Sequence, residues 1–380
     1  MERAPTSQYD KVKVIISDCH LSAGRFFEGR VNPHEDFHFD REMVEMFEYF
    51  SHGSKYGENE KGPVDVELII NGDYLDFLNV PFEGEFEEGI TEEIALFKCE
   101  AILKAHPQVM NAIRAFASLP NKSVTYLIGN HDGELFFEAV RKRITKEWDP
   151  NGQYPSQKIK IISERDHIKY PEGVEIHHGN QFESGNEFDF SQPFLKTTTG
   201  KSILNIPWGS VYVLKIVNRL KWEREYLDKI RPVKIFLLIG FFTDPIFTFK
   251  FLFLSLFYFF KVRLNPHGRR TTWKQTINAL KQEGKVFQDL ESEARNLLDE
   301  NEKTHTIVFG HTHRPMHKIY PDGKQYLNTG TWTKMIDLDW RQVGSPIRRT
   351  FALLVFKDGE VRAELRQWVG EAGPHQAFNG

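Results

Sequence analysis

The chain has 380 residues, enough to bury the core of one large domain or of two. Its formal net charge is −4 and its pI is about 6.4, so it has no global basic field and we expect no nucleic-acid partner. The first ten residues are polar, which predicts that they are not a signal peptide. Cys19 and Cys99 form no CxxC motif and favour a reducing, cytoplasmic location.

Hydrophobic patterning predicts a mixture of strands and helices. Aliphatic and aromatic runs predict strands at 11–16, 66–70, 124–128, 159–162, 174–176, 306–309, 325–327, 350–356 and 360–368. Helical patterns cover 39–50, 91–119, a segment ending near 146, about 203–230, and 272–298. Asp358-Gly359 predicts a hairpin turn between the last two strands.

Five of these predicted strands end in acidic, amide or imidazole side chains. In chain order these are Asp18 and His20, Asp73 and Asp76, Asn130 and His131, His178, and His311 and His313. In α/β folds, sites form beyond the carboxyl ends of strands. Mixed Asp, Asn and His ligands suit divalent ions such as manganese, iron or zinc, so the pattern predicts a metal site.

Alternation along the first strand predicts that Asp18 and His20 share one side of the backbone, while Cys19 packs on the other. Of the adjacent His177 and His178, only one should face the site, and His178, beside a glycine, is the better candidate. Each motif also has a structural explanation. An Asp–His pair can be a salt bridge at a strand end, and an HxH pair can simply be polar residues of a loop.

The ordered series resembles the calcineurin-like metallophosphoesterase family, whose pattern is DxH, GDxxD, GNH[DE], a lone H before G, and GHxH. In this sequence it stands as Asp18-Cys19-His20, Gly72-Asp73-Tyr74-Leu75-Asp76, Gly129-Asn130-His131-Asp132, His178-Gly179 and Gly310-His311-Thr312-His313. The resemblance implies an α+β fold, an α/β/β/α sandwich of two mixed sheets flanked by helices. Residues 1–183 and 304–380 would form it, with 184–303 as a helical insertion.

The resemblance also implies a hydrolase of phosphoesters or pyrophosphates with a dinuclear metal centre. By this resemblance, the ligands are Asp18, His20 and His313 for one ion, Asn130, His178 and His311 for the other, and Asp73 as the bridge. Manganese is the expected metal, with iron or zinc as alternatives. Two such ions clamp the phosphoryl oxygens, and a hydroxide bridging them is the expected nucleophile.

The histidine of GNH[DE] in this family resembles a general acid or a charge stabiliser on the leaving-group side. His131 occupies that place, and Asp76 would orient its ring through a hydrogen bond. A carboxylate there raises the imidazole pKa and keeps the ring protonated for donation. The alternative for Asp76 is a carboxylate that stabilises a helix N-terminus.

Within the family, the stretch 311–315 and the later 326–332 are similar to the UDP-2,3-diacylglucosamine diphosphatase branch. That similarity makes Arg314 a candidate substrate-binding residue and predicts an amphipathic, lipid-linked substrate. The branch usually carries Arg where this chain has His131, and its members are usually shorter. A soluble nucleotide phosphodiesterase or phosphoprotein phosphatase acting on a small phosphorylated substrate, and a silent membrane-bound scaffold, remain alternatives.

The segment 233–264 is rich in phenylalanine but is interrupted by Lys234, Asp244 and Lys250. A spanning helix needs about 20 apolar residues with few charges, so we expect no span. Basic residues flank its most apolar part, 233–260, at Lys221, Arg224, Lys229, Arg231, Lys261, Arg263, Arg269 and Arg270. This arrangement favours a lid that lies peripherally on the inner face of the membrane. The alternative is that the aromatic side chains pack on each other or in a homodimer interface.

Overall fold

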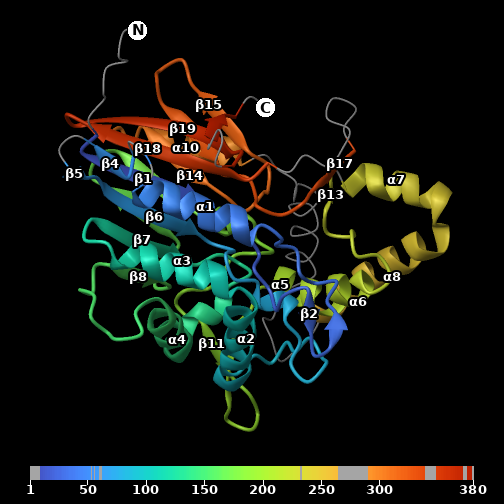
Figure 1. Cartoon of the computed structure of the whole chain (residues 1–380). Helices are drawn as coiled ribbons and strands as arrows, with labels where there is room; N and C mark the ends of the chain where they lie inside the picture. The colour runs from blue at the N-terminus through green and yellow to red at the C-terminus, as the bar shows by residue number, and fades with distance from the viewer. Residues whose placement is uncertain are drawn as a thin grey trace.

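The computed structural model describes residues 9–52, 54, 56–59, 62–231, 233–263, 290–338, 348–370 and 375–378. In this part of the chain, two large mixed β-sheets carry helices on their outer faces (Figure 1). The expected α+β sandwich is therefore confirmed.

The larger sheet has seven strands, and its centre is parallel. Its order is β20 (His375–Ala377), β19 (Glu360–Trp368), β18 (Thr350–Lys357), β1 (Lys11–Ile16), β6 (Asp65–Asn71), β7 (Lys122–Leu127) and β8 (Ile159–Ile162). Neighbours from β1 to β8 run parallel, whereas β18 pairs antiparallel with both β1 and β19. The carboxyl ends of β1, β6 and β7 therefore meet at one edge of the sheet.

The second sheet has five strands, of which the central three are parallel. Its order is β15 (Met316–Ile319), β16 (Gln325–Asn328), β14 (Thr306–Phe309), β10 (Val174–His177) and β9 (His167–Tyr170). The two edge strands, β9 and β15, were not predicted from the sequence. Both are short and carry His and Lys, so their apolar signal is weak, and they form by pairing with β10 and β16.

Alternate side chains of the strands in the larger sheet belong to two different hydrophobic clusters. Ile15 and Ile69 pack against Ile176 and Val308 between the two sheets. Their strand neighbours, such as Val14 and Leu68, face the helices on the other side of the larger sheet. Those helices are α1 (Asp40–Ser51), α2 (Glu92–Ala105), α3 (Pro107–Ser118) and α4 (Glu138–Trp148). The outer face of the second sheet is covered by α10 (Glu291–Glu300), so the layers are α/β/β/α.

The prediction of one helix over 91–119 is wrong, because α2 ends at Ala105 and α3 begins at Pro107. Proline lacks the N–H that would continue α2, whereas it is well suited to the first turn of a new helix. The predicted helix over 272–298 has only its end in the described residues, as α10. Residues 264–289 lie outside them.

The prediction of a helix over 203–230 is also wrong in part. A hairpin of β11 (Phe194–Lys196) and β12 (Ser202–Leu204) turns at Gly200, whose φ is 79°. Pro207 then caps α5 (Trp208–Tyr212), which continues through the π-helical η4 (Val213–Val217) into α6 (Asn218–Lys221). After turns, β13 (Ile230–Arg231) pairs with β17 (Ile336–Asp337).

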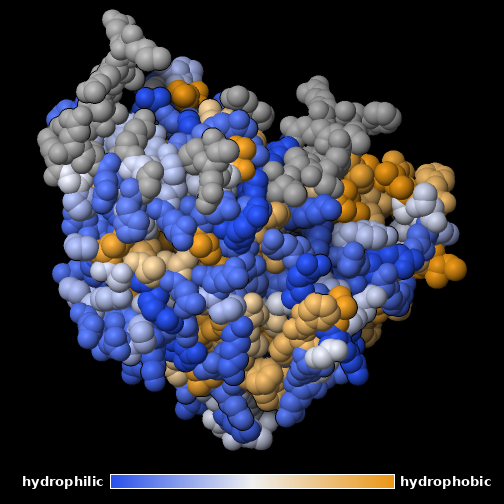
Figure 2. Space-filling model, in the orientation of Figure 1, coloured by the Kyte–Doolittle hydropathy of each residue, from blue (hydrophilic) through white to orange (hydrophobic). Residues whose placement is uncertain are grey.

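The phenylalanine-rich segment forms a helical hairpin of α7 (Val233–Thr243) and α8 (Pro245–Arg263). It projects at the right of Figure 1, and Figure 2 shows hydrophobic side chains gathered over it. Among the described residues, no helix combines the length and the apolar character needed to span a membrane. The smaller elements are β2 (Phe26–Phe27), β3 (Arg30–Val31), β4 (Glu58–Asn59), β5 (Gly62–Pro63), η1 (Phe77–Asn79), η2 (Gly133–Phe136) and η3 (Asn180–Phe182).

Candidate metal centre

The structure gathers the strand-end residues into one site. Asp18 and His20 follow β1, Asp73 follows β6, Asn130 and His131 follow β7, His178 follows β10, and His311 and His313 follow β14. Their donor atoms form three overlapping groups, each small enough to surround an ion. Residues separated by almost three hundred positions thus meet because five parallel strands end at the same edge of the sandwich.

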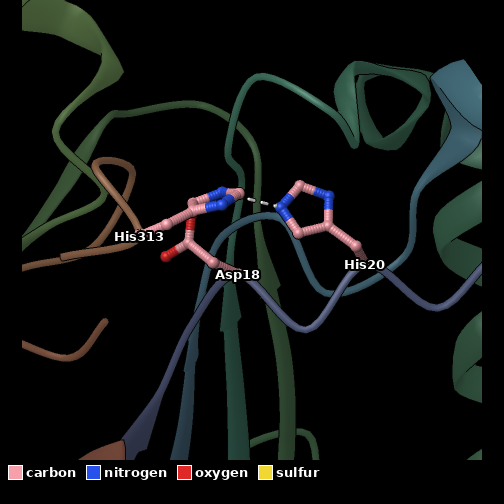
Figure 3. A group of neighbouring side chains, drawn as sticks. All are labelled: Asp18, His20 and His313. Atoms are coloured by element: carbon pink, nitrogen blue, oxygen red, sulfur yellow. Dashed lines mark hydrogen bonds and ion pairs between the residues drawn. The ribbon is translucent and has the colours of Figure 1, made fainter. Parts of the chain in front are cut away.

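The first group consists of Asp18, His20 and His313. Figure 3 shows the two rings pointing toward each other from different loops, with the Asp18 carboxylate beside His313. The Nε2 atoms of His20 and His313 are 3.0 Å apart, and Nε2 of His313 lies 3.3 Å from Oδ1 of Asp18. All three side chains are buried or nearly so.

The second group contains Asp73, His178 and His311. Nε2 of His178 lies 3.2 Å from Oδ2 of Asp73 and 3.3 Å from Oδ1 of Asn130. A third group, His20, Asp73 and His131, joins the other two. Asp73 therefore belongs to the second and third groups, and His20 links the third group to the first.

The spacing of these atoms suits shared metal ions. Metal–nitrogen and metal–oxygen bonds of about 2.1 Å place ligands of one ion about 3.0–3.4 Å apart. The distances between His20 and His313, His178 and Asp73, and His178 and Asn130 all fall in this interval.

Local backbone strain places several of these side chains. Asp18, His20, Asp73, His311 and His313 all have positive φ, between 50° and 67°. Non-glycine residues in this conformation cost about 1 kcal/mol or more each and cluster at functional sites. Asp18 and His20 lie together at the site and Cys19 packs in the core, as predicted, but strand alternation is not the cause, because β1 ends at Ile16. Their orientation comes from turns that bond to the neighbouring loop, where Gly72 O and Asp73 O accept from their backbone N–H groups.

Two glycines allow the loops to approach this closely. A Cβ on Gly72 would lie 2.4 Å from Nδ1 of His178. A Cβ on Gly310 would lie 2.6 Å from Oδ2 of Asp18. The glycines of the GDxxD and GHxH motifs are therefore required by packing against site residues, beyond the freedom that they give to the turns.

Three histidine rings each hydrogen-bond through one ring nitrogen to an acceptor that belongs to none of the donor groups. Nδ1 of His20 donates to Oδ2 of Asp76 at 2.9 Å, and Nδ1 of His178 donates to the carbonyl oxygen of Asn71 at 2.7 Å. Nε2 of His311 donates to Oε2 of Glu183 at 2.9 Å. Such anchors fix the tautomer and leave the other ring nitrogen as a free donor, as is typical of metal-binding histidines. Asn71 and Glu183 were not predicted, since no motif marks them.

The expected hydrogen bond between Asp76 and His131 is present, at 3.0 Å. Burial alone would lower the pKa of His131, but the carboxylates of Asp76 and Asp73 outweigh it and raise that pKa to about 10. Burial would raise the pKa of Asp76, but the charges and hydrogen bonds of His131 and His20 hold it well below its usual range. Asp76 also accepts from the backbone N–H of Asn79, so it caps η1 as well. Both roles considered from the sequence coexist.

Asp132 is a buried carboxylate that sequence reasoning left without a role. It accepts hydrogen bonds from the Gly129 backbone N–H, from the Tyr126 hydroxyl and from the Tyr74 backbone N–H. These bonds fix the turn that carries Asn130 and His131. Its place in the GNH[DE] motif was the available signal.

Two further candidates lie apart from the cluster. His177 faces away, stacked on His167 and within 3.0 Å of the Gln181 amide, as expected. Arg314 has an exposed side chain, and its backbone N–H bonds to Thr312. Its substrate-binding role stays a prediction.

No protein-family model matches the sequence, and no curated protein matches it. Solved structures that align with it include a dimetal phosphatase from Danio rerio, at 11% identity and TM-score 0.39, covering 98% of this chain and 100% of that one. A single mutant of Vps29 from Entamoeba histolytica aligns at 12% identity and TM-score 0.28, covering 97% and 99%. A predicted phosphoesterase from Streptococcus pneumoniae aligns at 10% identity and TM-score 0.27, covering 97% and 96%. Identities and scores this low do not establish a shared activity.

Proposed function

We propose that the chain is a metal-dependent phosphoesterase, a hydrolase of phosphate ester or pyrophosphate bonds that uses two divalent ions. The observation that carries this proposal is the set of three overlapping donor groups, of which two contain Asp73 and the third is linked to them through His20. Asp18, His20 and His313 would hold one ion on one side of Asp73. Asn130, His178 and His311 would hold the other ion on the opposite side.

The donor set fits such ions. Carboxylate oxygens, an amide oxygen and anchored imidazole nitrogens suit manganese, iron or zinc, and we propose manganese. When bound, two such ions polarise the phosphoryl oxygens and offset the negative charge that develops on them. Asp73 supports this arrangement because a shared anionic carboxylate reduces the repulsion between neighbouring cations.

His131 is proposed as the proton donor to the leaving oxygen. Its ring is 18% exposed at the rim of the site, while Asp76 beneath it is fully buried. Asp76 accepts from Nδ1, which directs Nε2 outward, and the raised pKa keeps the ring protonated at neutral pH. The backbone N–H of His131 donates to Oδ1 of Asp73 at 2.8 Å, so the proposed acid is tied to the shared carboxylate.

The substrate is proposed to be amphipathic and lipid-linked, as in the UDP-2,3-diacylglucosamine diphosphatase branch. Support comes from α8, which is apolar on two faces. One face packs Phe247 and Phe251 against η4 and α6. The other presents Ile246, Phe249 and Phe253 to solvent, and they are 83%, 62% and 69% exposed. Figure 2 shows the hydrophobic surface at this hairpin. Exposed apolar patches of this kind mark membrane or lipid contacts.

Charged residues in the hairpin and in the segment before it form ion pairs. Arg224 donates to Oδ2 of Asp244 at 3.1 Å, and Glu223 pairs with Lys250. Lys221 and Lys229 both pair with Asp36, at 2.8 and 2.7 Å. Neighbouring acids therefore offset the charges of Lys221, Arg224 and Lys229, and the contact of the basic flanks with an anionic membrane surface stays a prediction. We propose a peripheral membrane contact that rests on the apolar face, with little contribution from these three cations.

The proposal is tested by removing and restoring the metal. Chelator-stripped protein should lose hydrolysis of bis(p-nitrophenyl) phosphate and regain it as Mn²⁺ reaches two ions per chain. An Asp73→Asn variant should regain little, because the proposed bridging carboxylate loses its charge. Equal rates with and without metal would contradict the proposal.

A further inference from the structure

Glu183 makes the contact that sets the orientation of His311. Its Oε2 atom accepts from Nε2 of His311 at 2.9 Å, and the two side chains are 15% and 8% exposed. Glu183 follows η3, five residues after His178. The short segment 178–183 therefore carries one candidate ligand, His178, and also Glu183, which orients a second candidate ligand, His311.

The chemistry of imidazole gives this contact a consequence. A neutral ring has one N–H and one free nitrogen, and a carboxylate at Nε2 keeps the proton there. Nδ1 of His311 is then the nitrogen available to the group formed with Asp73 and His178. Glu183 does for His311 what Asp76 does for His20, although through the opposite ring nitrogen.

The position of Glu183 is in turn set by the start of the insertion. Nδ2 of Asn186 donates to Oε2 of Glu183 at 2.8 Å, and Asn180 donates to the backbone oxygen of Asn186. The backbone N–H of Gly209, in α5, donates to the oxygen of Gly185 at 2.8 Å. A Cβ on Gly209 would lie 2.2 Å from Oδ1 of Asn186, so α5 packs directly on this turn.

We propose that Glu183 is a positioning residue for the metal centre, and that it couples the docking of the insertion to His311. The path runs from α5 through the 185–186 turn to the Glu183 carboxylate and then to the ring. This inference rests on the proposed two-metal function. Beyond that function, it proposes that metal binding at His311 depends on the packing of α5, which lies outside the ligand motifs.

Metal binding tests the proposal without measuring activity. Chelator-stripped wild type, Glu183→Gln and Glu183→Ala are titrated with Co²⁺ by calorimetry and by visible absorption. Loss of such a support typically weakens metal binding by about 10–100-fold. We expect one of the two Co²⁺ sites to bind more weakly in Glu183→Gln than in wild type, and more weakly still in Glu183→Ala. Two ions should still bind at saturation, with a changed absorption band. Glu187→Gln, the same charge change on an exposed neighbour, should match wild type.

The coupling is tested by a double-mutant cycle. Gly209→Ala should weaken Co²⁺ binding in the wild-type background and add little to Glu183→Ala, because both interrupt one path. The thermal midpoint of each metal-free variant shows whether it is folded.

The outcomes separate the two proposals. If wild type binds no Co²⁺, the proposed function fails. If wild type binds two ions and both Glu183 variants bind them equally tightly, the positioning role alone is overturned. A Glu183→Ala protein that holds only one ion at saturation would make Glu183 a direct ligand, which also overturns it. If the effects of Gly209→Ala and Glu183→Ala on Co²⁺ affinity are additive, α5 and His311 are not coupled through Glu183.

Discussion

The ring of His131 is hydrogen-bonded to the carboxylate of Asp76, with 3.0 Å between Nδ1 and Oδ1. The other oxygen of the same carboxylate accepts from His20 at 2.9 Å. One buried anion therefore orients both a candidate metal ligand and the candidate acid, so the two functions cannot be altered independently at this position.

Replacing Asp76 with Asn should change the pH dependence of hydrolysis. Asp76 raises the pKa of His131, whose protonated form is the proposed proton donor, so we expect activity to be lost as pH rises through that pKa. Without the carboxylate the pKa falls, and the alkaline loss of kcat/KM should begin at a lower pH. The amide also supports His20 less well, so kcat/KM should fall by about 10–100-fold at its optimum. Profiles of kcat/KM against pH measure both effects.

The exposed Glu88→Gln variant removes one negative charge away from the cluster and should keep the wild-type profile. An alkaline limb that stays in place in Asp76→Asn would argue against His131 as the acid.

Replacing Gly310 with Ala should impair the centre while every proposed ligand is retained. The new methyl group would meet Ser17 Oγ at 2.4 Å and the Asp18 carboxylate at 2.6 Å. Asp18 must move, so one ion should bind about tenfold more weakly or worse, with a stability loss of about 1–3 kcal/mol. Bound manganese after dialysis and the thermal midpoint are the measurements. Gly89→Ala, where nothing lies within 4 Å, is the control. Equal manganese content in both variants would contradict this prediction, because it would mean that the loop carrying Gly310 moves and Asp18 keeps its position.

His106 should make stability depend on pH. Burial alone lowers its pKa, but hydrogen bonds to Asp40 and Glu35 outweigh that and raise it to about 9. Because the folded-state pKa lies above the unfolded value, the stabilisation is complete below about pH 6.5 and is lost as pH rises through about 9. It amounts to about 3 kcal/mol at most.

Urea unfolding of wild type and His106→Gln should therefore differ most near pH 6 and least near pH 10. A difference that is constant with pH would mean that His106 contributes by packing alone.

The tip of the α7–α8 hairpin should determine binding to lipid vesicles. Phe242 and Ile246 are 84% and 83% exposed, so replacing both with Ser removes apolar surface without opening the core. Vesicle affinity should fall about tenfold per side chain, while hydrolysis of a small soluble phosphodiester is unchanged. Cosedimentation with phosphatidylcholine vesicles is the measurement. Ile319→Ser, which removes a 65% exposed side chain on β15, should bind like wild type.

A homodimer interface is the competing explanation for this patch. Sedimentation velocity would favour it if wild type dimerises without vesicle binding and the Phe242→Ser, Ile246→Ser protein is monomeric.

Much of the architecture was predictable because its signals are local. Short stretches rich in Val, Ile and other apolar residues mark β1, β6 and β14, which are largely buried, and polar residues follow each of them. Errors arose where a local pattern was ambiguous. The helical periodicity of 91–119 continues across Pro107, so the break there was not predicted. The helical pattern of 203–230 likewise includes residues of β12, which pairs with β11.

By itself, the sequence determined which side chains stand at the strand ends, and the order of those motifs predicted that they would meet. Only the tertiary structure decided which ring nitrogen faces the site, because the anchors lie far away in the chain. Asp76 is 56 residues from His20, Asn71 is 107 from His178, and Glu183 is 128 from His311. The pairing of Asp244 with Arg224 was likewise undecided until folding brought them together. Local patterns record what a segment buries, whereas hydrogen-bond partners depend on packing between segments.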